Sequence, residues 1–404
     1  MQLLSLVRYA GAATALGATL LVALVQTPRP ASGEVSSVRG FVVSDVSYGF
    51  SSATSAREIC PNGPTMSARN IFAATPEGSR HEGESDADYG RRLRAGAAQV
   101  STAANGQNAC LNPEAFPADP HHHVVTGDVQ VYGMDLDGQV SRASGPAAPG
   151  TCAHNDFRGV GAKRGVDDQF FRAVGCMPTM LPGGQGNTFA IEMLTGSWGI
   201  LISLEDVQDL QNDNDVVVHF YANQDPIQLS AAREALPYAT YQPIADPRFQ
   251  STTHGRIVNG VLTTQPTDVR FQWVVNSMRL ERELDDARLQ VTIAPDGSLD
   301  GLLAGYSPVD GIYDTQFGFR NGKDAQGRLS RFRVGSANGY ADTGHTCNGV
   351  YHALQQLADG HRDPVTGRCS AISTQYRIHA VPAFVAAPGP EHTAHADAAD
   401  RLGS

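Results

Sequence analysis

The stretch on which the expected architecture turns runs from Cys152 to Cys176 and reads CAHNDFRGVGAKRGVDDQFFRAVGC. A cysteine stands at each end, a histidine-asparagine-aspartate cluster begins at His154, and the adjacent acids Asp167 and Asp168 open an apolar run. Several strand-like segments follow this stretch in close succession, whereas loop-rich sequence with some helical character precedes it. We therefore expect this stretch to form the junction of the fold and to be the first place to search for a site.

Short strand-like segments fill the sequence after this junction. Apolar runs occur at 199–204 and 215–221, and Asn259-Gly260 is a strong hairpin signal between two further runs. The 42 glycines and 23 prolines of the 404-residue chain favour many turns over a helical bundle. The pattern predicts a mainly β fold with a β-sandwich or jelly-roll-like core, a helix-containing N-terminal region and a short disulfide-braced C-terminal segment.

A few helices are predicted around these strands. Asp86–Ala104 has Ser85 as a capping residue and acids in its first turn, which favour the positive end of the helix dipole. A second, short helix is expected after Asp167, which would cap it. Asn348–Ala358 has apolar residues at helical spacing, whereas residues 306–345 are expected to be irregular.

The N-terminus predicts export from the cytoplasm. Residues 1–8 carry a positive charge, an uncharged run of mostly small and apolar residues follows, and small residues end it at Gly33. This is the pattern of a secretory signal peptide, so the mature protein is expected to be secreted or periplasmic, with no membrane span after cleavage. An uncleaved anchor helix is the alternative, because the run is about long enough to span a membrane.

The organisation expected from these patterns has five parts. They are a signal peptide at 1–33, a loop-rich N-terminal region with helices at 34–150, a β-sandwich core at 151–310, a C-terminal segment at 311–385 and a disordered tail at 386–404.

Six cysteines follow the predicted signal peptide, and an even number in an exported chain indicates disulfides. They are Cys60, Cys110, Cys152, Cys176, Cys347 and Cys369. Sequential pairing (60–110, 152–176 and 347–369) is the natural expectation, because each pair would then bracket a compact segment. The spacing gives no support to a zinc ribbon, a thioredoxin-like motif or a c-type haem site.

The net charge limits the kinds of partner that the protein is expected to bind. The formal charge at pH 7 is -11, and no dense basic run offsets it. Because a phosphate backbone demands clustered lysines and arginines, a nucleic-acid partner is not expected. The expected partner is a ligand or cell-surface component that the sequence does not identify.

The acidic turn loops of the sequence predict calcium binding. Calcium takes six to eight oxygen ligands, which tight loops rich in aspartate, asparagine and glycine supply. Three loops contain the candidate ligands Asp135, Asp137, Asp156, Asp167, Asp168, Asp209, Asp213 and Asp215. A fourth loop of the same kind is Asp359-Gly360 with Asp363. The alternative for each loop is that these residues only form turns and helix caps.

Histidines offer a second kind of site. Imidazole suits zinc or copper, and the candidates are His121-His122-His123 with His154, and separately His345, His352 and His361 around Cys347. The alternative is that these histidines lie in solvated polar loops.

Catalytic motifs such as a nucleophile elbow, a zinc-protease helix or a phosphate loop do not occur in this sequence. His154 and Asp156 are able to act as acid and base, although no nucleophile is evident. Trp198 and Trp273, the two tryptophans, are expected to be buried, and exposure would indicate a binding surface instead.

Two functions follow from these observations. The first is a secreted or periplasmic, calcium-stabilised binding or structural protein without catalytic activity. The alternative is a secreted metal-dependent hydrolase that acts on a polysaccharide or an ester, in which His154, Asp156 and Asp167 converge in a cleft.

Overall fold

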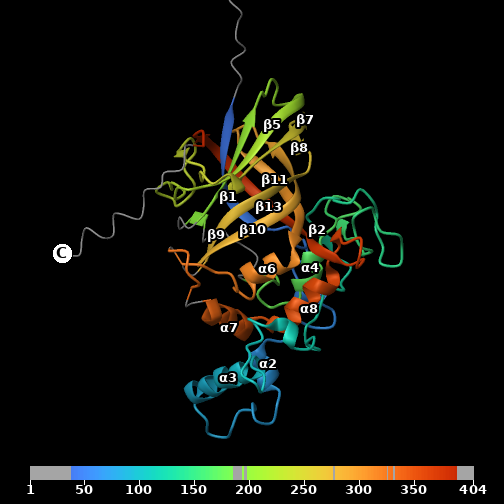
Figure 1. The fold of residues 1–404 in the computed structure, drawn as a ribbon, viewed down its shortest axis with the longest axis vertical. Helices are drawn as coiled ribbons and strands as arrows, with labels where there is room; N and C mark the ends of the chain where they lie inside the picture. The colour runs from blue at the N-terminus through green and yellow to red at the C-terminus, as the bar shows by residue number, and fades with distance from the viewer. Residues whose placement is uncertain are drawn as a thin grey trace, which may run out of the picture. The chain divides into compact units, whose positions relative to one another are not determined.

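The structure, a computed structural model, describes residues 38–184, 193–194, 198–275, 278–324, 326–330 and 333–388 (Figure 1). The described residues belong to one compact unit. The predicted signal peptide and nearly all of the predicted disordered tail lie outside them.

Strands outweigh helices along the described chain. The strands are β1 (Arg39–Tyr48), β2 (Gln130–Val131), β3 (Arg158–Gly159), β4 (Ile200–Glu205), β5 (Asn212–Ala222), β6 (Thr240–Tyr241), β7 (Gln250–Val258), β8 (Val261–Thr264), β9 (Thr267–Val275), β10 (Met278–Ile293), β11 (Leu299–Pro308), β12 (Gly360–Arg362) and β13 (Cys369–Val385). The helices are α1 (Ala56–Ile59), α2 (Ala68–Ala73), α3 (Asp86–Val100), α4 (Gln169–Val174), α6 (Val309–Gln316), α7 (Arg333–Thr343) and α8 (Cys347–Leu357), with 3-10 turns η1 (Pro113–Ala115) and η2 (Pro247–Phe249).

Eight of the strands form one antiparallel sheet that closes on itself. The order is β1-β4-β5-β7-β8-β10-β11-β13, and β13 pairs with β1 to complete the ring. Three further strands attach to this ring, with β12 and β6 on β13 and β9 on β10. The expected mainly β fold, with helices before it and a disulfide-braced C-terminal segment, is therefore confirmed, and the pairing refines the expected sandwich into one continuous sheet.

Strands from distant parts of the sequence meet in this sheet. β1 pairs with β4 on one side and with β13 on the other, as in the register of Phe41 opposite Pro382. One hydrophobic core extends through the sheet and the helices beside it, with Phe220 and Leu289 among its members. The helices α4, α6 and α8 lie beside one end of the sheet (Figure 1).

Both tryptophans lie in this core, as expected. Trp198 and Trp273 are 4% and 6% exposed, and their rings stack with centroids 4.6 Å apart. An aromatic binding surface built on an exposed tryptophan is therefore not present at either position.

Local signals locate several elements correctly. Asn259 and Gly260 connect β7 to β8 with φ values of 52° and 75°, which suits a turn that needs two left-handed residues. Helix α3 begins at Asp86, and the Ser85 side chain accepts a hydrogen bond from the backbone amide of Asp88, as the capping pattern predicts.

Two local expectations are wrong. The segment 306–345, expected to be irregular, contains α6 and α7. Helix α6 has a glycine at Gly311 and weak helical propensity, but it buries Ile312 and Tyr313, so tertiary packing stabilises it. The helix after the junction is capped by Asp168, whose carboxylate accepts from the amide of Phe171, and not by Asp167.

The sequential disulfide pairing is also wrong. The bonds are Cys60–Cys176, Cys110–Cys347 and Cys152–Cys369. Each bond joins segments that are distant in sequence and pack together in space. The backbone amide of Thr65, close to the first bond, donates to the carbonyl of Cys176. Spacing along the chain carries no information about such contacts.

Candidate metal centre

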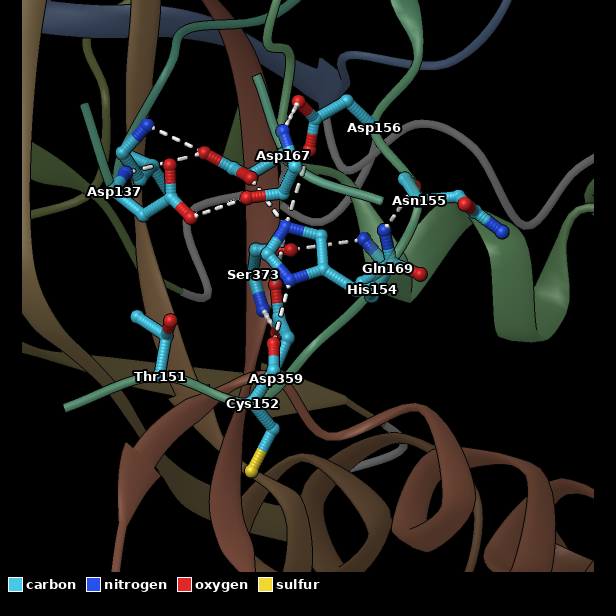
Figure 2. A network of polar contacts seen from close by, with 12 residues as sticks. Asp137, Thr151, Cys152, His154, Asn155, Asp156, Asp167, Gln169, Asp359 and Ser373 are labelled. Carbon is cyan, nitrogen blue, oxygen red and sulfur yellow. Dashed lines mark hydrogen bonds and ion pairs between the residues drawn. The ribbon is translucent and has the colours of Figure 1, made fainter. Parts of the chain in front are cut away.

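Four segments meet around His154 (Figure 2). They are the loop after β2, the segment that begins at Cys152, the start of α4 and the connection between α8 and β12. The amide of Cys152 donates to the carbonyl of Asp359, the amide of Asp359 donates to the carbonyl of Ala371, and a disulfide joins Cys152 to Cys369. These bonds hold the middle of the chain against its C-terminal strands.

The imidazole of His154 lies among three carboxylates. Its Nε2 atom is 2.7 Å from Asp167 Oδ1, 3.2 Å from Asp156 Oδ1 and 3.9 Å from Asp359 Oδ2. All four side chains are at most 5% exposed. Nδ1, on the other side of the ring, is 2.8 Å from the carbonyl oxygen of Cys152.

These partners restrict the protonation state of the ring. A carbonyl oxygen only accepts hydrogen bonds, so Nδ1 of His154 carries a proton and donates it to Cys152. Nε2 then faces carboxylate oxygens, which accept unless they are protonated. The arrangement therefore needs positive charge at Nε2, supplied by a second proton on the ring or by a cation, or else a proton on Asp167.

Several carboxylate oxygens of this group are buried without a donor. Asp167 Oδ2 accepts from the amide of Leu136 at 2.6 Å, and Asp359 Oδ1 accepts from the amide of Ser373 at 2.7 Å. Within the described residues, Asp359 Oδ2 and Asp168 Oδ2 have no hydrogen-bond partner. Asp156 Oδ1 is near His154 Nε2 but is not oriented as its acceptor, because the closer Asp167 oxygen takes the proton.

The pKa values reflect this excess of buried acid. Burial opposes protonation of His154, but the nearby carboxylates of Asp156 and Asp167 outweigh it and raise its pKa to about 11. Burial raises the pKa of Asp167 to about 6 and that of Asp359 to about 7, against the ordinary 3.8. The pKa of the fully buried Asp168 is also raised, by burial. One imidazolium does not neutralise this group, so protons or a cation are needed for the remainder.

Asp137 completes a set of side chains suited to a metal ion. One ligand atom from each of Asp137, His154 and Asp167 lies within 4.8 Å of the others. Carboxylate oxygens suit calcium, whereas imidazole suits a transition metal. A histidine that donates from Nδ1 to a backbone carbonyl, as His154 does, leaves Nε2 directed toward a metal.

Three of the four acidic loops predicted from the sequence thus contribute to one cluster. Asp137, Asp156, Asp167 and Asp359 approach His154, and Asp168 lies beside them as the cap of α4. Asp135 instead accepts from the amide of Gly138 within its own turn.

The remaining acidic loop, residues 209–215, lies apart from this cluster and forms a turn. Asp213 accepts from the amides of Gln208 and Asp215 at 2.7 and 3.2 Å, and these backbone bonds lower its pKa. Asp215 pairs with His254 at 2.7 Å, and the amide of Asp209 also donates to Asp213. In this structure the carboxylates of Asp209 and Asp213 form turn contacts and that of Asp215 forms an ion pair, and calcium binding by this loop stays a prediction.

The remaining histidines do not join His154. His122 Nε2 and His123 Nδ1 bond the carbonyls of Ala173 and Gly63, whereas His121 is exposed. The three histidines around Cys347 also separate. They are His345, which is buried, His352, which bonds the carbonyl of Phe116, and His361, which faces Asp286.

Sequence reasoning missed the support that β13 gives to the cluster. Ser373 donates its amide to Asp359 and accepts from the amide of Gln169, while Gln375 donates to the carbonyl of Asp167. Ser373, Thr374 and Gln375 are three consecutive polar residues with no exposed surface. Such a polar run inside an otherwise apolar strand is the sequence signal that could have indicated a buried polar site.

Comparisons with known proteins add no relative: no family model, no curated protein and no solved structure matches this chain. Among the described residues, no helix has the length and apolar character needed to cross a bilayer.

Proposed function

We propose that this chain is a secreted or periplasmic binding or structural protein without catalytic activity, and that calcium stabilises its fold at the cluster around His154. The observation that carries the proposal is the convergence of three buried carboxylates on one imidazole, with buried oxygens left without donors. The three disulfides support an oxidising location, where such bonds persist.

Asp137, Asp156, Asp167 and Asp359 would hold the ion, since hard cations prefer carboxylate oxygens. The ion would supply the positive charge that the buried carboxylates lack. These residues belong to four separate segments, so a common ligand would stabilise the folded chain against the unfolded one. His154 would keep its Nδ1 proton on the carbonyl of Cys152 and lose the proton on Nε2.

Burial argues against the alternative, a secreted metal-dependent hydrolase acting on a polysaccharide or an ester. His154, Asp156 and Asp167 do converge, as that function requires. Their side chains are only 4%, 5% and 0% exposed, however, and a general acid or base must lie within hydrogen-bond reach of its substrate. An activity screen with Asp156→Ala as control separates the two functions.

Thermal melts of the mature protein test the calcium proposal. The melting temperature is expected to rise when calcium replaces chelator, by the equivalent of about 2.7 kcal/mol at a calcium concentration one hundred times the dissociation constant. Zinc and manganese provide the comparison, together with metal analysis of the purified protein. An identical melting midpoint in calcium and in chelator would contradict the proposal that calcium stabilises the fold. A shift of the midpoint with zinc alone would assign the cluster to a transition metal.

A further inference from the structure

A cavity of about 510 Å³ lies beside the first half of β10. Residues Arg279 to Glu283 form one wall, and α6 with the segment around Lys323 forms the other. This volume is in the range of pockets that hold small ligands or short peptide segments. None of the residues around His154 lines it.

The lining is positively charged, although the chain as a whole is acidic. Its charged members are Arg248, Arg270, Arg279, Arg282 and Lys323 against Glu281, Glu283 and Asp314. The acids already have partners. Glu281 accepts from Arg248 and Arg270 at 3.0 and 2.9 Å, and Glu283 pairs with Arg270. Asp314 accepts hydrogen bonds from Arg320 and Asn321, neither of which is one of the five basic residues of the lining.

Arg279 and Lys323 face each other without an acid. The amide of Arg279 donates to the carbonyl of Lys323 at 2.6 Å, and the reverse bond is 3.1 Å, so the two form a directly opposed antiparallel pair. Side chains of such a pair lie on the same face, roughly 5 Å apart at Cβ, and like charges there are destabilising. In the described parts of the chain neither side chain forms an ion pair, so an anion placed between them would relieve the repulsion.

The main chain of β10 is open along the same cavity. Arg279 directs its amide and carbonyl away from β9, and alternation along a strand directs those of Glu281 and Glu283 the same way. The next pairing on this edge is Asp285 with Tyr306 of β11. Between these two pairings, the described residues provide no partner for the outward amides and carbonyls of Glu281 and Glu283.

We propose that this cavity binds an extended acidic peptide. The peptide would add a short strand to the open edge, with main-chain hydrogen bonds to Glu281 and Glu283 and carboxylates beside Arg279 and Lys323. The open stretch from Arg279 to Asp285 is about 20 Å long at the usual rise of a strand, which accommodates about five residues. The inference rests on the binding role proposed above but not on calcium, so either can fail alone.

A labelled pentapeptide that alternates glutamate and threonine is the probe, and fluorescence anisotropy at low salt is the measurement. Arg279→Gln and Lys323→Gln are each expected to weaken binding about tenfold, because a charge-assisted hydrogen bond is lost. Arg256→Gln removes an exposed cation of β7 outside the cavity and is expected to leave binding unchanged. A lysine-threonine peptide is expected not to bind.

A second comparison tests the main-chain contacts. Methylation of alternate peptide nitrogens keeps the charge but removes hydrogen-bond donors, and it is expected to weaken binding at least tenfold. Equal binding of the parent and methylated peptides, with full competition by citrate, would assign the cavity to small anions and overturn the peptide proposal. Absence of binding to the full chain, or equal binding by the Arg279→Gln/Lys323→Gln variant, would overturn it as well.

Discussion

The buried carboxylate of Asp359 has one oxygen bound by the amide of Ser373 and one without a donor among the described residues. Its neighbours His154 and Asp167 supply one imidazole and one more acid. The charge on Oδ2 of Asp359 has to be compensated either by a bound cation or by a proton, so a substitution at this residue distinguishes the two.

Asp359→Asn tests this position. The amide keeps the shape of the carboxylate and removes one buried charge, so we expect the melting temperature in chelator to be retained and the increase with calcium to be lost. Asp45→Asn is the matched control, because Asp45 is an exposed acid of β1. The calcium proposal fails at this residue if Asp359→Asn responds to calcium as the parent does.

His345 presents a different imbalance. It is 1% exposed, both ring nitrogens lack partners among the described residues, and burial lowers its pKa to about 3. A buried polar group without hydrogen bonds costs about 1–3 kcal/mol. We therefore expect His345→Phe, which retains an aromatic ring beside Phe317, to increase the free energy of unfolding by about 1 kcal/mol in denaturant titrations. A decrease of that size in the free energy of unfolding would contradict the absence of a hydrogen-bond partner at the ring nitrogens of His345.

Helix α4 and strand β13 are the elements that build the cluster. Asp168 caps α4, and the residue before it, Asp167, turns to His154. On β13, Ser373 and Gln375 bind Asp359 and the backbone of the α4 start. The cluster is thus part of the interface between one helix and the strand next to it.

The stability of this interface is expected to depend on pH. Asp167 and Asp359 have pKa values of about 6 and 7 in the folded protein against an ordinary 3.8, and His154 has about 11 against 6.5. At all three residues the folded protein holds its proton more tightly than the unfolded chain does. In chelator, stability should therefore fall as the pH rises from about 4 to 7, through the two aspartates, and from about 6.5 to 11, through His154.

Melting temperatures measured across this pH range check that expectation. Calcium competes with protons for the same carboxylates, so its stabilising effect should grow as the pH rises. The Asp359→Asn variant should show a shallower fall between pH 4 and 7. A stability that rises through this range, in the variant and the parent alike, would contradict the assigned protonation.

Elements with local signals could be predicted from the sequence, and those defined by distant contacts could not. Ser85 located the start of α3, and Asn259-Gly260 located the β7–β8 turn, because a cap and a two-residue turn depend only on neighbouring residues. The stretch Cys152–Cys176 is predicted as a candidate site because its histidine and acids are close in sequence. The approach of Asp359 to His154 depends on β13 and the Cys152–Cys369 bond, which leave no local pattern.

At the scale of the whole molecule, the disulfides join early and late parts of the chain. They close segments of 116, 237 and 217 residues. The chain-entropy model assigns about 5 kcal/mol to closing a loop of this size, less any strain.

Removal of one bond tests this contribution. The variant Cys110→Ala/Cys347→Ala is expected to lose about 2–5 kcal/mol of unfolding free energy in denaturant titrations, because its unfolded chain is less constrained. Peptide mapping without reductant provides the control for connectivity. A peptide that links Cys60 to Cys110 would contradict the pairing described above.

The ring of strands also constrains how the protein is made. β1, the first strand of the described chain, pairs with β13, the last. A growing or translocating polypeptide therefore carries β1 without one of its two partners until synthesis has passed residue 385. Folding dominated by such distant pairings is slow and leaves apolar surface exposed to aggregation. We therefore expect the ring to close only after synthesis is complete, and the early strands to be prone to aggregation until the final strand pairs with β1.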